Sequence, residues 1–214
     1  MKHTTIPTIS IPQNPSAEQL RSALIEQGAV LALDCHNWSS DYPYAPRVTA
    51  RMALCEQGIA LMFDVAEEHT KAVERENNGK VWEDSCVEFF VSNPVGEGYY
   101  NFELNAIGTL LAAHRLSRES ATHFDHEQLA QVVRYGTFDH KPIDIRHQNE
   151  WWVAEIIPLV LIGATEPPKR LRANLYKCGD KLSRPHFMSW SPIELERPNF
   201  HCPEFFGELI FDYE

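Results

Sequence analysis

The stretch Tyr99-Tyr100-Asn101-Phe102-Glu103-Leu104-Asn105-Ala106 decides the fold class, because its apolar and polar side chains alternate residue by residue. In an extended strand, successive side chains point to opposite faces of the sheet. One face of this strand therefore carries aromatic and aliphatic groups, and the other carries Asn101, Glu103 and Asn105. A period of two is typical of an antiparallel strand with one face on the core. The polar face is either solvated or a binding surface.

The preceding apolar segment, Cys86-Val87-Glu88-Phe89-Phe90, follows the same alternation. Glu88 falls on the face opposite to Val87 and Phe89, so its carboxylate points away from the core that those residues fill. Two roles fit a carboxylate in this place. It either accepts hydrogen bonds from a ligand or pairs with a basic residue on a neighbouring strand.

Short β-type runs recur along the rest of the chain at fairly regular spacing. Together they cover residues 29–33, 48–56, 59–65, 86–92, 99–107, 109–115, 151–157, 172–176 and 206–211. Gly58 marks a hairpin turn, and Gly108 separates two adjacent runs. This pattern predicts an all-β fold, an antiparallel β-sandwich of jelly-roll or immunoglobulin-like two-sheet architecture. The segment 125–134 fits either a helix or a strand.

One short helix is expected near the N-terminus. Ser16 and Gln19 have the spacing of a capping box, residues 17–27 follow with apolar side chains at helical spacing, and Gly28 can end the helix. The length of 214 residues suits one domain over 1–214, in which residues 1–28 form an N-terminal extension and helix.

Composition narrows the function classes. The formal net charge is −11, which lacks the basic surface that nucleic acid requires. No segment has the roughly 18 apolar residues of a membrane span, and no signal peptide is visible. Five cysteines without a CxxC pair indicate reduced thiols. We expect a cytoplasmic protein as the sequence stands, or a secreted one if the chain is a mature fragment.

Exposed aromatic rings beside amide and carboxylate groups are what a sugar-binding site needs, because sugars present flat apolar faces ringed by hydroxyls. Trp82 follows the polar stretch Asn77-Asn78-Gly79-Lys80 and precedes the strand that carries Glu88. Trp190 lies in Ser189-Trp190-Ser191-Pro192, where the proline argues against a central strand. Both tryptophans are candidates for loop positions at a binding site, with core packing as the alternative.

Several motifs together resemble carbohydrate-binding module family 9 and the wider DOMON-like sandwiches. They are Val81-Trp82-Glu83-Asp84-Ser85-Cys86-Val87-Glu88-Phe89-Phe90, the alternating strand 99–105 with Gly108, and Arg172-Ala173-Asn174-Leu175-Tyr176-Lys177-Cys178-Gly179 with the C-terminal block 186–207. The resemblance is closest to a single-domain, family-9-like branch and covers most of the chain from about Ala29 onward.

This resemblance implies non-catalytic binding of a mono- or oligosaccharide between two tryptophan platforms, here Trp82 and Trp190. Glu88 would be the acidic hydrogen-bond acceptor, and Asn101, Glu103 and Asn105 its neighbours. The typical module carries an arginine with an amide where this chain has those three residues. A partner glycoside hydrolase is also implied.

The typical module also holds structural calcium through carboxylates and carbonyl oxygens. In this chain the oxygen ligands would come from Asp64, Glu67, Glu68 and Asp84, although the sequence has no dense calcium loop. Solvated surface acids are the alternative reading of these four residues.

Two other functions are compatible with the sequence. A glycoside hydrolase would use a carboxylate pair such as Glu88 and Glu103, one as acid and one ionised. A haem-binding DOMON-like domain would need axial ligands such as Met52, Met62 or His186 facing one cavity.

Overall fold

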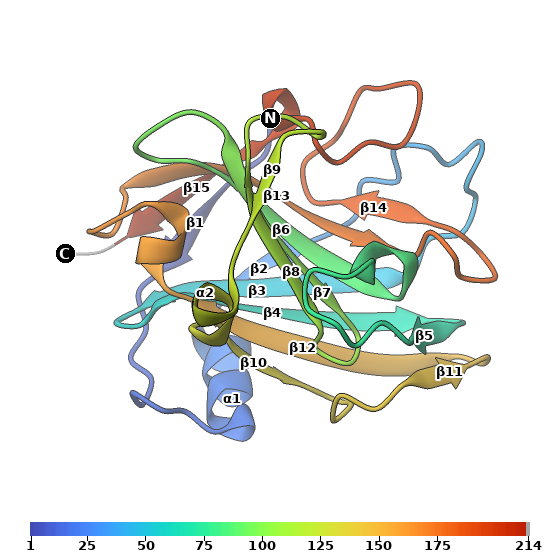
Figure 1. Ribbon diagram of the computed structural model, residues 1–214, viewed down its shortest axis with the longest axis horizontal. Coiled ribbons are helices and arrows are strands. Elements are labelled where there is room, and N and C mark those ends of the chain that lie inside the picture. Colours follow the sequence, from blue (N-terminus) through green and yellow to red (C-terminus); the bar gives the residue numbers. More distant parts are fainter. Residues whose placement is uncertain (213–214) are drawn as a thin grey trace.

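The structure is a computed structural model that describes residues 1–212, and it contains two β-sheets packed face to face (Figure 1). The larger sheet has the order β1 (His3–Pro7), β15 (Gly207–Asp212), β13 (Arg170–Cys178), β6 (Cys86–Ser92), β7 (Tyr99–Asn105), β8 (Leu110–Arg115) and β9 (Ala121–His123), and β14 (Phe187–Ser189) pairs with β13. The second sheet has the order β10 (Val133–Gly136), β12 (Asn149–Ile157), β4 (Gly58–Glu67), β3 (Arg47–Cys55) and β2 (Ala29–Ala32). Strands β5 (Thr70–Ala72) and β11 (Ile143–Ile145) pair separately.

The predicted antiparallel β-sandwich is confirmed. All strand pairs are antiparallel except β1 with β15, which run parallel. Each of the nine predicted runs corresponds to a strand, with shifts at some ends. The sequence analysis missed β1 at the N-terminus. It also missed the short strands β5, β9, β11 and β14, because three residues are too few to show a period of two.

Helices are few, as expected. Helix α1 (Ala17–Gln27) has the predicted capping box between Ser16 and Gln19, and its Leu20 and Leu24 pack on the outer face of the second sheet. The segment 125–134, which fitted either a helix or a strand, contains one of each: α2 (His126–Ala130) is followed by the start of β10. Three short 3-10 helices complete the chain: η1 (Val81–Glu83), η2 (Leu159–Ile162) and η3 (Pro203–Phe205).

The N-terminal segment is more than an extension. Strand β1 closes one edge of the larger sheet against β15, and α1 covers the second sheet. Gly58, in the predicted hairpin between β3 and β4, has a φ of 141° and lies so close to Ile157 that a Cβ would be 2.1 Å from its carbonyl oxygen. Only glycine fits there.

Three apolar layers hold the fold together. The first lies between the sheets, the second lies under α1, and the third covers the outer face of the larger sheet. Trp38 and Phe200, from the long segments that follow β2 and β14, pack in the third layer. The polar face of β7 is covered as well, so the solvated face considered from the sequence is not present: Asn101 and Asn105 are fully buried.

A charged cluster lies inside the layer between the sheets. Lys177 on β13 points inward, and its Nζ lies 2.9 Å from a carboxylate oxygen of Glu67 on β4 and 2.8 Å from Nε2 of His186. Trp151 donates to the other Glu67 oxygen at 2.7 Å. Burial, and then the charge of Lys177, lowers the pKa of His186 well below its usual value, so the ring is neutral and accepts from the ammonium.

A second carboxyl group, that of Glu155 on β12, also faces this interior. It lies opposite Arg134 on β10, whose Nη1 donates instead to the carbonyl oxygen of Gly108 at 3.0 Å. One Glu155 oxygen is buried without a hydrogen-bond partner in the described part of the chain. Burial therefore raises the pKa of Glu155 to about 8.

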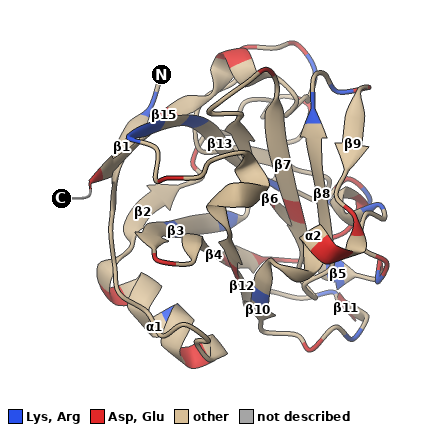
Figure 2. Cartoon of the chain, turned by 60° about the vertical axis from the view of Figure 1, so that its left-hand side comes forward, with Lys and Arg blue, Asp and Glu red and all other residues tan. Residues whose placement is uncertain are grey.

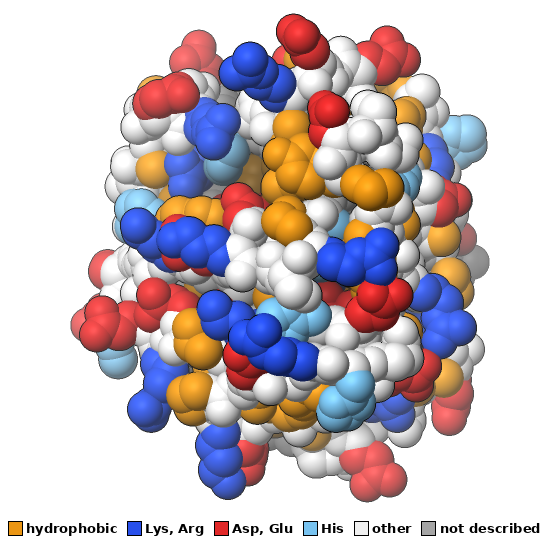
Figure 3. Space-filling model, turned by 90° about the vertical axis from the view of Figure 1, so that its right-hand side faces the viewer, with side chains coloured by type: hydrophobic (Ala, Val, Ile, Leu, Met, Phe, Trp, Pro, Cys, Tyr) orange, Lys and Arg blue, Asp and Glu red, His pale blue; other side chains and the backbone are white. Residues whose placement is uncertain are grey.

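Over residues 1–212, none of the helices combines the length and the apolar character that crossing a membrane would require. Acidic and basic side chains are interspersed on the face shown in Figure 3, which carries no continuous basic surface.

Candidate functional site

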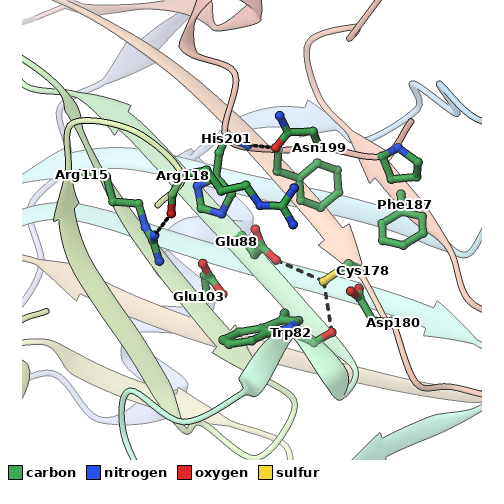
Figure 4. Close-up of a pocket in the computed structure, with 12 residues that line it drawn as sticks. Trp82, Glu88, Glu103, Arg115, Arg118, Cys178, Asp180, Phe187, Asn199 and His201 are labelled. Atoms are coloured by element: carbon green, nitrogen blue, oxygen red, sulfur yellow. Dashed lines mark hydrogen bonds between the residues drawn. The ribbon is translucent and has the colours of Figure 1, made fainter. Parts of the chain in front are cut away.

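A pocket of about 310 Å³ opens on the outer face of the larger sheet, where β6, β7, β8 and β13 lie side by side (Figure 4). Its volume is at the lower end of the range for small-molecule sites, about 300–1,000 Å³. The lining combines aromatic, acidic and basic side chains: Trp82, Glu88, Glu103, Arg115, Arg118, Cys178, Asp180, Phe187, Pro198, Asn199, Phe200 and His201.

Trp82 lies at one side of this pocket, in the 3-10 helix η1. The turn after β13 positions it: the backbone N–H of Asp180 donates to the Trp82 carbonyl oxygen at 3.2 Å, and that of Lys181 donates to Glu83 at 3.3 Å. The indole is half-buried and packs against the third apolar layer. This placement agrees with the loop position predicted for Trp82.

Glu88 and Glu103 lie directly opposite each other on β6 and β7, with both carboxyl groups in the pocket. Only 3% and 4% of these residues is exposed, because the loops over the sheet cover them. Burial, and then the charge of Glu103, raises the pKa of Glu88 well above its usual value, and burial raises the pKa of Glu103 to about 7. The pair therefore holds at least one proton near neutral pH.

A hydrogen-bonded chain connects this pair to a basic residue on the next strand. Arg115 donates from Nε to Asn101 Oδ1 at 2.9 Å, and Asn101 donates from Nδ2 to Glu103 Oε1 at 2.8 Å. The second guanidinium contact, from Nη1 to the Arg118 carbonyl oxygen at 2.7 Å, fixes the loop after β8. Figure 2 shows the acidic position on β7 and the basic position at the end of β8 on adjacent strands. Asn101 thus positions pocket groups without lining the pocket itself.

Phe187 lies on the side of the pocket away from Trp82. Phe200 also lines the pocket, and its ring centroid is 6.1 Å from that of Phe187. Phe200 stacks on Tyr176, with ring centroids 4.1 Å apart. His201 shares a 2.9 Å hydrogen bond with the hydroxyl of Tyr99. Burial lowers the pKa of His201 to about 3, so this imidazole is neutral and polar.

The prediction that Trp190 forms a second platform is wrong. Trp190 follows β14 and is 4% exposed, it packs in the layer between the sheets, and it does not line the pocket. Its ring lies against Gly207, where an added Cβ would come within 2.5 Å of the indole. The motif around Trp190 belongs to the core, and the aromatic side chains that line the pocket together with Trp82 include Phe187 and Phe200.

Asn105 is also outside the pocket. Its side chain donates to the Glu74 carbonyl oxygen and to Asp84, each at 3.0 Å, and it accepts from the backbone of Thr109. The residue therefore organises the loop before η1. The strand alternation placed Asn105 on the correct face but at an end that the pocket does not reach.

Each of the four carboxylates considered for calcium already has a partner within the chain. Asp84 accepts from the backbone of Val73 and Glu74 and from Asn105, while Asp64 pairs with Arg51. Glu67 pairs with Lys177 in the core, and Glu68 pairs with Arg184 at the surface. Over residues 1–212, none of these four acids belongs to a group of three acidic, histidine or cysteine side chains close enough to share an ion.

The proposed haem ligands do not face a common cavity either. Met52 packs between the sheets, whereas Met62 packs under α1 on the other face of the second sheet. His186 is buried beside Lys177. The two methionines lie on opposite faces of one sheet, and the His186 ring is already bonded to Lys177, so the three residues do not supply an axial pair.

The family model described as carbohydrate-binding family 9 matches residues 18–211, which is most of the chain. The chain belongs to carbohydrate-binding family 9. A candidate carbohydrate-binding protein from Bacteroides uniformis ATCC 8492 is 38% identical, with a TM-score of 0.88 over 97% of this chain and 99% of the other. A search of the curated proteins finds no significant match.

More distant members of family 9 share the fold. A module from Caldicellulosiruptor kristjanssonii, solved with cellotriose, has a TM-score of 0.62 at 8% identity and covers 100% of this chain and 95% of its own. A family-9 module from the same organism, solved with glucose, has a TM-score of 0.61 at 8% identity. The match covers 100% of this chain and 97% of that module. At that identity the likeness extends to the fold alone.

Sequence reasoning missed several residues that line the pocket of this family-9 domain. Arg115 could have been found, because Leu111, Ala113 and Arg115 alternate along the predicted strand 109–115 and share the face of Glu103. Asp180, Phe187, Asn199 and His201 lie in or beside connecting segments, where no periodic signal marks the side that faces the pocket.

Proposed function

We propose that this pocket binds one or two residues of a carbohydrate without cleaving it. The observation that carries the proposal is the convergence of Trp82, the Glu88–Glu103 pair and Arg115 in one open pocket of a family-9 domain. An indole supplies the flat apolar surface that packs on a sugar ring, and the carboxyl and guanidinium groups supply acceptors and donors for its hydroxyls.

The opposite wall completes the site that we propose. Phe187 lies across the pocket from Trp82, so a sugar ring can contact aromatic surface on two sides (Figure 4). The pocket is too small for a long polysaccharide segment and suits a monosaccharide or disaccharide unit. Glucose and cello-oligosaccharides are the first ligands to test, because the Caldicellulosiruptor modules were solved with them.

Hydrolysis by the carboxyl pair is the competing assignment. A glycoside hydrolase places its two carboxyl groups on either side of the scissile bond. Glu88 and Glu103 lie next to each other on one face of one sheet, so both can reach the same bound sugar. Measuring reducing sugar released from cello-oligosaccharides tests this assignment directly, since cleavage that disappears in Glu88→Gln would assign a hydrolase.

The test of the binding proposal is calorimetry of the protein and of Trp82→Ala with glucose, cellobiose and a panel of other glycans. Removing the indole should cost roughly 1–3 kcal/mol of binding, which weakens affinity about 5- to 150-fold. Trp152→Ala is the matched control, because Trp152 is another half-buried indole but lies on β12 of the other sheet. Its affinity should be unchanged.

Two results would overturn the proposal. One is the absence of binding to every glycan in the panel by the wild-type protein. The other is binding that Trp82→Ala leaves intact, or that Trp152→Ala weakens to the same extent. Trp82→Phe retains an aromatic ring and serves as the second variant if the alanine substitution prevents folding.

A further inference from the structure

We propose that Cys86, Cys178 and Glu88 form a binding site for one thiophilic divalent cation of the Zn²⁺ class at the bottom of the pocket. Cys86 on β6 and Cys178 on β13 lie directly opposite each other in the antiparallel pair. Glu88 is two residues beyond Cys86, so alternation brings its carboxyl group to the same face. The three donor atoms all lie within 4.8 Å of one another.

The spacing of the donors suits tetrahedral coordination. With metal–sulfur bonds near 2.3 Å, two sulfurs in a tetrahedral site lie about 3.8 Å apart, and a sulfur and an oxygen lie about 3.5 Å apart. The Cys178 sulfur is already 3.1 Å from Glu88 Oε1. Side-chain shifts of roughly 1 Å or less would bring all three donors onto one ion.

The chemistry of the donors selects the class of metal. Two thiolates and one carboxylate favour Zn²⁺ and similar thiophilic ions, whereas calcium and magnesium require oxygen ligands alone. All five cysteines of the chain are free thiols. Binding one divalent ion displaces to solvent the two thiol protons and any proton that the Glu88 carboxyl group holds, and no electron is transferred.

The pocket gives an ion a path to the three donor atoms and leaves its fourth coordination position open. Glu88 and Cys178 line the open pocket, while Cys86 lies fully buried behind them. The carboxyl group of Asp180 lies beside Cys178 on the pocket side (Figure 4). Zinc sites that keep an exchangeable ligand have three protein ligands and a fourth position that is open, here toward the pocket.

Co²⁺ titration of the reduced, metal-free protein tests this inference, because tetrahedral thiolate coordination gives strong visible bands and a near-ultraviolet charge-transfer band. We expect both to saturate at one ion per chain and to disappear when Zn²⁺ is added. Loss of outer partners of metal ligands already costs about 10–100-fold in affinity, so Cys178→Ser should weaken binding by at least about tenfold. Glu88→Gln should weaken binding while the charge-transfer band remains.

Cys35→Ser is the matched control, because Cys35 is a free thiol outside this cluster. It should leave the titration unchanged. The absence of a charge-transfer band in the wild type overturns the inference, as does a band that survives intact in Cys178→Ser or is equally weakened in Cys35→Ser. The wild-type and Glu88→Gln titrations decide the question if Cys178→Ser does not fold. None of these readouts requires a sugar, so the result is independent of the proposed function.

Discussion

Replacing Glu155 with glutamine should make the protein more stable at high pH and leave its stability at low pH nearly unchanged. In the folded protein burial raises the pKa of this carboxyl group from 4.5 to about 8, so it is neutral there until the pH exceeds that value. In the unfolded chain it ionises near its ordinary pKa. Between these two values the folded state holds more protons than the unfolded state, so the free energy of unfolding falls as the pH rises.

The size of the effect follows from the pKa difference. A tenfold change in acidity corresponds to about 1.4 kcal/mol, so a pKa raised from 4.5 to about 8 lowers the free energy of unfolding by about 5 kcal/mol once the pH exceeds both values. Glutamine has the shape of the protonated acid and does not ionise. The stability gained by Glu155→Gln should therefore be about 1 kcal/mol at pH 5 and several kcal/mol at pH 9.

Urea unfolding followed by tryptophan fluorescence, at a series of pH values, measures this difference. Other titrating groups affect both proteins equally and cancel when the two curves are subtracted. Glu150→Gln is the control, because Glu150 lies on the same strand but pairs with Arg47 in an exposed ion pair, and its removal should cost no more than about 1 kcal/mol. Parallel stability curves for the wild type and Glu155→Gln from pH 5 to pH 9 would refute the reasoning.

Two other predictions concern charged groups on either side of the larger sheet. Because the pKa of Glu103 is about 7, the affinity for a bound sugar should rise by roughly tenfold from pH 6 to pH 8, as a neutral acceptor becomes a charged one. Calorimetry should find no such rise for Glu103→Gln, and an equal rise in that variant would contradict the assignment. Lys177→Met should lower the free energy of unfolding by about 3–5 kcal/mol, because Glu67 would be left unpaired in the core. A loss below about 1 kcal/mol in denaturant unfolding would show that the pair contributes little.

The local part of the site could be predicted from the sequence, because strand alternation is a property of neighbouring residues. Alternation placed Glu88 and Glu103 on the outer face of the larger sheet, and the structure has them there. It could not show that two long connecting segments cover that face, since their paths depend on tertiary packing. For this reason the burial of the carboxyl pair, and its high pKa values, were not foreseen.

Trp190 shows the limit of reading a tryptophan by its neighbours in the sequence. The nearby proline suggested an exposed loop, yet the residue directly follows β14, which pairs with β13, and the ring is buried against Gly207. A three-residue strand is stabilised by its partner and not by its own sequence, so no local pattern marks it.

The division of the chain into one domain over residues 1–214 and the location of the protein in the cell stay predictions.

The buried pair of Lys177 and Glu67 constrains how the two sheets can align when they pack together during folding. Contacts between aliphatic side chains are non-directional, so an apolar interlayer can be nearly satisfied by several sliding alignments. Lys177 on β13 and Glu67 on β4 come into contact in only one of these alignments. Any misaligned sandwich would bury both charges apart, at a cost of several kcal/mol. We expect the pair to select one alignment and, since Lys177 precedes Cys178 in the chain, to determine how the opposite face of β13 presents its side chains to the pocket.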